Sequence, residues 1–164
     1  MPDTFDLMEF LPYRLAILSE RVSRRLATDY ERTHGLTVAE WRVLVHLLRV
    51  EAVSVRDIRD YANLDKPKVS RAVARLEEAG LVKKRRGSGD GRLVAISLTD
   101  AGRATMAEVL PAAQDVEARL LSALNATELK TLSRVMEKLH AVLDADPAAR
   151  PRTHVPATEN PDQD

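Results

Sequence analysis

Apolar side chains recur every three or four residues over much of the chain, which is the spacing of amphipathic helices. The first such stripe predicts one long helix from about Leu7 to Thr33, ending at Gly35, since glycine readily closes a helix in the left-handed conformation. This helix has more apolar surface than one short neighbour covers, so we expect it to pair with a second chain. The stripe consists of Leu11, Leu15, Leu18, Val22, Leu26 and Tyr30.

Three short helices are predicted next, each after a residue suited to cap a helix N-terminus. Thr37 and Glu40 have the spacing of a capping box, Ser54 precedes the second helix, and Asp65 precedes the third. Pro67 is tolerated because it falls in the first turn of the third helix, which ends at Gly80. The positions expected to face the core are Trp41, Leu44, Val45 and Leu48, then Ile58, Tyr61 and Ala62, then Val69, Ala72, Val73 and Leu76.

The apolar period then changes from helical to extended. Two short runs, 81–86 and 92–98, flank a segment with three glycines, which predicts a β-hairpin. Val94, Ile96 and Leu98 alternate as one face of a strand.

Helical spacing returns after the hairpin. Thr99 is expected to cap a helix to about Leu124, with a kink or a break at Pro111. Asn125 and Glu128 cap a last helix that carries Leu129, Leu132, Val135, Met136, Leu139 and Leu143. We therefore predict a mainly α fold with a small β-hairpin, divided into a disordered start (1–6), a dimerisation helix (7–35), a winged helix-turn-helix domain (36–98), dimerisation helices (99–143) and a disordered acidic tail (144–164).

Composition excludes several classes of protein. Cysteine is absent, so disulfides and thiolate metal sites are excluded. The four histidines lack short ligand spacing, and we expect no metal. There is no phosphate-binding glycine loop, nucleophile elbow or HExxH motif, so we expect neither an enzyme nor a bound cofactor. No stretch reaches the roughly 18 apolar residues of a membrane span, and the start lacks signal-peptide regions. A soluble, cytoplasmic protein is expected.

The net charge of zero hides a basic segment. Residues 54–92 hold eleven Lys and Arg against six Asp and Glu. In the third short helix, Lys68, Arg71 and Arg75 fall on the face opposite the core, bordered by Lys66 and Ser70. Such a face is often merely solvated.

A second basic element follows the first. Lys83, Lys84, Arg85 and Arg86 form an unbroken run in the hairpin, and Arg92 follows its glycine-rich tip. Basic side chains on both elements of a winged helix-turn-helix favour binding to DNA, the helix in the major groove and the wing at the phosphates or minor groove.

Residues 36–102 resemble the multiple-antibiotic-resistance regulator (MarR) family of bacterial transcription factors. The motifs are Leu36-Thr37 with Trp41-Arg42-Val43-Leu44, Lys68-Val69-Ser70-Arg71 with 76–82 (Leu-Glu-Glu-Ala-Gly-Leu-Val), Asp90-Gly91-Arg92, and Leu98-Thr99-Asp100-Ala101-Gly102. With the flanking helices the likeness covers about residues 7–143.

The resemblance implies a homodimeric repressor of a pseudo-palindromic operator, released by a small and often aromatic acidic ligand. Ser70, Arg71 and Arg75 would then face the major groove, Arg92 would reach the minor groove, and Asp90 would pair with an arginine to hold the wing. Relatives often have a proline in the wing tip, where this chain has Gly87-Ser88-Gly89.

A ligand pocket is predicted from five further residues: Tyr13, Arg14, Trp41, Arg42 and His46. The arginines would pair with a carboxylate and the aromatic rings would form walls. Trp41 as plain core, and the arginines in structural ion pairs, are the alternatives.

Two other functions stay open on the sequence. The basic face would also suit a protein or RNA partner, and a DNA-binding protein of this kind can be an activator without ligand control.

Overall fold

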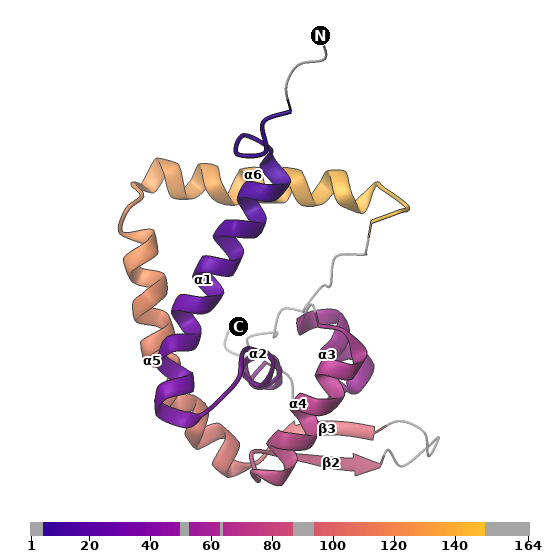
Figure 1. The fold of residues 1–164 in the computed structure, drawn as a ribbon. Coiled ribbons are helices and arrows are strands. Elements are labelled where there is room, and N and C mark those ends of the chain that lie inside the picture. Colours follow the sequence, from indigo (N-terminus) through magenta and orange to yellow (C-terminus); the bar gives the residue numbers. More distant parts are fainter. Residues whose placement is uncertain (1–4, 50–52, 63, 87–93, 150–164) are drawn as a thin grey trace, which may run out of the picture.

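The computed structural model describes residues 5–49, 53–62, 64–86 and 94–149. The chain is mainly helical with a small antiparallel sheet, as predicted (Figure 1). Its elements are α1 (Leu11–His34), α2 (Val38–Leu47), β1 (Val53–Ser54), α3 (Val55–Ala62), α4 (Lys66–Glu78), β2 (Val82–Arg86), β3 (Val94–Leu98), α5 (Asp100–Leu121) and α6 (Ala126–Asp144). None of the helices described is long and apolar enough to cross a membrane.

The predicted caps determine where four helices begin. The side chains of Thr37, Asp65, Thr99 and Asn125 each accept a hydrogen bond from a backbone N–H in the first turn of α2, α4, α5 and α6. At α2, Glu40 completes the capping box, since its Oε2 accepts the backbone N–H of Thr37 at 2.8 Å. Each cap satisfies an N–H that has no partner within the helix.

The N-terminal boundary of α1 differs from the prediction. The helix begins at Leu11 and not at Leu7, and residues 6–10 form turns, in which the Phe10 N–H donates to the Leu7 carbonyl. Pro12 explains the difference, because it has no N–H to donate to a preceding helical turn and its ring would clash there. The predicted end at Gly35 is confirmed, with φ at 64°.

The predicted break at Pro111 is wrong. Helix α5 is continuous across this proline and ends at Leu121, slightly before the expected position. Pro111 is exposed, and Val109 and Val116 are buried on either side of it. Packing of both halves outweighs the single helical hydrogen bond that proline removes.

The hairpin is part of a three-stranded sheet in the order β1-β3-β2. Strands β2 and β3 pair from Val82 with Leu98 to Arg86 with Val94. The sequence did not predict β1, whose two residues pair with Ile96 and Ala95, because two residues carry no detectable alternation.

The core joins α2, α3, α4 and the sheet into one lobe, which we define as the elements α2 to β3. All four residues predicted to face inward from α4 are buried, and so are Ile58 and Ala62 of α3. In α2 the buried face is shifted from the predicted one: Val43 and Leu47 are buried beside Leu44, whereas Trp41, Val45 and Leu48 are partly buried. The side chain of Tyr61 lies outside the described residues.

Helices α1 and α5 run side by side away from the lobe (Figure 1), and their packing includes an ion pair between His34 Nε2 and Glu108 Oε2 at 3.0 Å. Helix α6 continues from the far end of α5 and has no buried residue. Exposed apolar side chains gather on both distant segments: Leu11, Leu15 and Leu18 on α1, and Leu132, Val135, Met136, Leu139 and Leu143 on α6.

The segment Leu98–Gly102 joins the lobe to α5. The Thr99 hydroxyl donates to the Gly80 carbonyl at 2.6 Å, and the Thr99 N–H donates to the Leu81 carbonyl at 3.1 Å. A Cβ on Gly102 would overlap the Leu81 carbonyl oxygen and lie 3.1 Å from Leu98 Cδ2. The glycine is needed because α5 starts in direct contact with the backbone where α4 ends.

We predict that Gly102→Ala lowers the free energy of unfolding by about 1–3 kcal/mol, the usual cost of overpacking. Helix propensity alone would give the opposite sign, a gain of roughly 1 kcal/mol. Thermal and urea unfolding measure the change, and Ala104→Gly, at an exposed position of α5, calibrates propensity in the same helix. A stabilised Gly102→Ala variant would contradict this close approach.

Candidate nucleic-acid interface

Helix α4 presents a basic face opposite its buried one. Lys66, Lys68, Ser70, Arg71 and Arg75 are all exposed, as the spacing predicted. Their separation from the core follows from the helical period, since the buried positions of α4 occupy the other side.

The N-terminus of α4 is held by Asp65. One carboxylate oxygen accepts the Lys68 N–H at 2.8 Å, and the other pairs with Lys68 Nζ at 3.0 Å. These hydrogen bonds from Lys68, the backbone one first, hold the pKa of Asp65 below its usual value. The carboxylate therefore stays ionised at neutral pH and fixes the first turn of the basic face.

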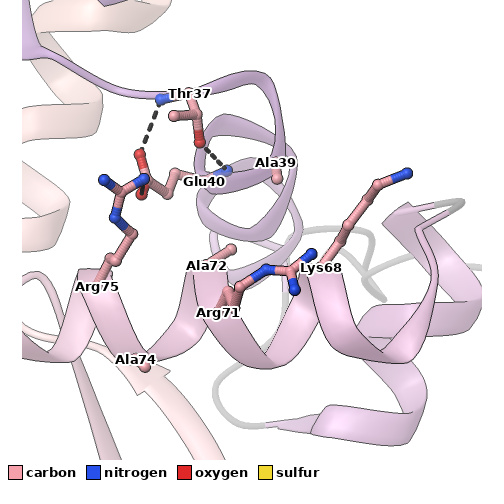
Figure 2. A pocket seen from close by; sticks show the side chains of 8 residues that line it. All are labelled: Thr37, Ala39, Glu40, Lys68, Arg71, Ala72, Ala74 and Arg75. Atoms are coloured by element: carbon pink, nitrogen blue, oxygen red, sulfur yellow. Dashed lines mark hydrogen bonds and ion pairs between the residues drawn. The ribbon is translucent and has the colours of Figure 1, made fainter.

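Arg75, in the last turn of α4, lies close to a buried acid. Its Nη1 is 3.7 Å from Oε1 of Glu40 in α2. The Glu40 side chain is 8% exposed and that of Arg75 68%. The pair lies in a groove of about 410 Å³ between α4 and the start of α2 (Figure 2). Its lining residues are Thr37, Ala39, Glu40, Lys68, Arg71, Ala72, Ala74 and Arg75.

Strand β2 supplies a second set of cations. Lys83, Lys84 and Arg85 are exposed. Lys84 Nζ pairs with Glu77 Oε2 of α4 at 2.6 Å, which links the wing to the end of that helix. The side chain of Arg86 and the tip residues predicted to bind DNA, Asp90 and Arg92, lie outside the described residues.

Two basic elements thus belong to one lobe, and carboxylates anchor three of their cations. Arg71 differs, because among the residues that the structure describes it has no carboxylate at ion-pair distance. The sequence located the cations but not the anchoring roles of Glu40 and Glu77. Their pairs cross between elements, and only the capping-box spacing of Glu40 singled it out.

The five residues of the predicted ligand pocket are not brought together within one chain. Tyr13 and Arg14 line a cavity of about 610 Å³ along the exposed N-terminal half of α1, where Arg14 pairs with Glu9 at 3.4 Å. Arg42 reaches Ser23 of the same helix, with Nη2 3.5 Å from the hydroxyl. At a helical rise of 1.5 Å per residue, Tyr13 lies about 15 Å along the axis from Ser23.

The α2 members of that set occupy the other end of α1. Trp41 stacks on Tyr30, with ring centroids 5.0 Å apart, and lines a cavity of about 540 Å³ between α1, α2 and α5. Burial raises the pKa of Tyr30 to about 12, so its ring stays neutral. His46 is buried, and burial, with Arg49, lowers its pKa. No group of three or more potential metal ligands occurs among the described residues.

The sequence and fold are similar to those of characterised proteins. Residues 34–93 match the model of the MarR family. The transcriptional regulator MgrA of Staphylococcus aureus is 30% identical over 142 residues, which cover 86% of this chain and 95% of MgrA. The transcriptional repressor MdtR of Bacillus subtilis is 26% identical, with 89% of this chain and 94% of MdtR covered.

Two solved structures share the fold. Sco3205, a MarR family regulator of Streptomyces coelicolor in complex with DNA, superposes with a TM-score of 0.77 at 23% identity, covering 93% of this chain and 97% of Sco3205. BpsR of Bordetella bronchiseptica, whose DNA binding is regulated by 6-hydroxynicotinic acid, superposes with a TM-score of 0.71 at 24% identity, covering 84% and 99%.

Proposed function

Because the chain belongs to the MarR family of DNA-binding transcriptional regulators, we propose that it is a homodimeric repressor of a pseudo-palindromic operator, released by a small aromatic acid. The observation that carries this proposal is the basic face of α4 beside the basic strand β2 in one folded lobe. MdtR, a relative that is itself a repressor, supports the sign of regulation.

In the proposed complex, α4 enters the major groove and the wing lies along the flanking backbone. Arg71 is the leading candidate to contact a base, because it is exposed near the middle of α4 and an arginine can donate two hydrogen bonds to guanine. Lys66, Lys68 and Ser70 lie beside it and suit phosphate contacts, as do Lys84, Arg85, Arg86 and Arg92 in the wing.

The proposed dimer would form through the segments farthest from the lobe. Exposed leucines of α1 and the unburied α6 present apolar surface that a second copy would cover. Two-fold symmetry then requires two half-sites, with centres about one turn of DNA, roughly 10 bp, apart.

Ligand control is proposed from chemistry and from one relative. The cavity beside Trp41 has aromatic and aliphatic walls, and Arg14 and Arg42 can each pair with a carboxylate. BpsR, which shares the fold, is regulated by an aromatic acid. A coupling of about 1–3 kcal/mol would change operator affinity by about 5–150-fold.

We predict that the protein enriches a palindromic duplex from a random DNA pool at physiological salt. Arg71→Ala should weaken binding to that duplex by about 1–3 kcal/mol and relax the preference at one base pair of each half-site. Arg24→Ala, which removes the same charge from the exposed surface of α1, is the matched control. A folded wild type that enriches no duplex would contradict the proposed function and favour a protein or RNA partner.

For the dimer, we predict that Leu18→Glu weakens self-association by about 100-fold or more, because symmetry places two charges in one apolar interface. Leu18 is 56% exposed in the single chain, so the subunit should still fold. Sedimentation equilibrium measures the dissociation constant. Ala16→Glu, exposed on another face of α1, should leave it unchanged, and equal dissociation constants for both variants would place the interface elsewhere.

For the ligand, we predict that 6-hydroxynicotinic acid or a related aromatic acid weakens operator binding at fixed salt. The neutral amide of the same acid is the control for the carboxylate. Arg14→Gln and Arg42→Gln, tested separately, identify the arginine whose removal abolishes the response. If no aromatic acid changes the affinity, control must come from the amount of protein or from another partner.

A further inference from the structure

A buried carboxylate lies inside the surface proposed to face DNA. Glu40 is almost fully enclosed at the start of α2, and its carboxylate lines the groove that Lys68, Arg71 and Arg75 border (Figure 2). A negative charge here opposes the approach of phosphates unless a nearby cation balances it. The argument that follows rests on the proposed DNA binding.

The two oxygens of Glu40 have different partners. Oε2 accepts the Thr37 N–H at 2.8 Å, which closes the capping box of α2. Oε1 lies 3.7 Å from Arg75 Nη1, on the other side of the groove. One side chain therefore fixes the start of α2 and also holds a cation of α4.

The cations of α4 divide by their position along the helix. In Figure 2, Arg75 extends toward Glu40, whereas Lys68 points away from it. Residues near the N-terminus of a recognition helix make the base contacts, and Arg75 is in its last turn. Arg75 is thus poorly placed to read bases and well placed to hold α4 against α2.

We propose that Arg75 is a positioning residue, and that its ion pair with Glu40 sets the orientation of α4 and hence the specificity for the operator. The pair also cancels the charge of a carboxylate that would otherwise repel DNA. In this assignment Arg71 contacts a base, while Arg75 acts through Glu40.

The test uses Glu40→Gln, Arg75→Gln and the double variant of the full-length protein. Glutamine at position 40 keeps an oxygen for the Thr37 N–H, so the cap of α2 is preserved while the charge is removed. Dissociation constants are measured for the selected operator and for a random duplex over a range of salt concentrations. Thermal unfolding reports on the fold, and Arg75→Lys tests rescue by a cation of different shape.

We expect Glu40→Gln to lower the operator-to-random affinity ratio about 5-fold or more, even though it removes an anion from the DNA-facing surface. Arg75→Gln should lower the ratio similarly, and the double variant should be no worse than either single variant. The salt slope of Arg75→Gln for random duplex should equal that of the wild type. Arg75→Lys should recover part of the ratio.

The opposite pattern would overturn the proposal. If Arg75 contacts DNA directly, Glu40→Gln binds the operator as tightly as the wild type or more tightly, and Arg75→Gln loses about 0.9 of the salt slope. If Arg75→Gln does not fold, the sign of the Glu40→Gln effect decides between the two roles. A wild type that selects an operator while Glu40→Gln leaves it unchanged defeats only this inference, whereas a wild type that selects none defeats the proposed function.

Discussion

The hydroxyl of Thr99 holds together three elements that would otherwise meet only through side chains. It donates to the Gly80 carbonyl, just beyond the end of α4, and accepts the Gly102 N–H at the start of α5. The Thr99 backbone contacts Leu81 immediately before β2, and Gly102 allows the close approach. Because these contacts involve backbone atoms, α5 cannot tilt without moving the end of α4 and the base of the wing. The basic surface is thus mechanically tied to the helix that leads to α6.

Local signals in the sequence were sufficient for most of the fold. Caps at Thr37, Asp65, Thr99 and Asn125, and stops at Gly35 and Gly80, depend on neighbouring residues and were predicted correctly. The failures have non-local causes. Packing on both sides of Pro111 preserved a helix that propensity would interrupt, and β1 exists only because β3 offers two residues a partner.

The candidate site shows the same division. A helical period is enough to place Lys68, Arg71 and Arg75 on one exposed face. Their differences are tertiary, because the carboxylate that holds Arg75 comes from another helix. The set of Tyr13, Arg14, Trp41, Arg42 and His46 was chosen by residue type, and residue type contains no information on distance along α1. This set therefore remains a prediction, divided between two cavities of the chain.

The position of β2 gives its cations a second consequence. In the order β1-β3-β2 this strand lies at the edge of the sheet, so part of its backbone faces away from β3. Such an edge can pair with the edge strand of another molecule and start aggregation. Lys83, Lys84 and Arg85 would bring like charges together in any such pairing of two wings. The same side chains that suit a polyanion therefore discourage the sheet from growing, and a wing made neutral would lose its protection against misassembly.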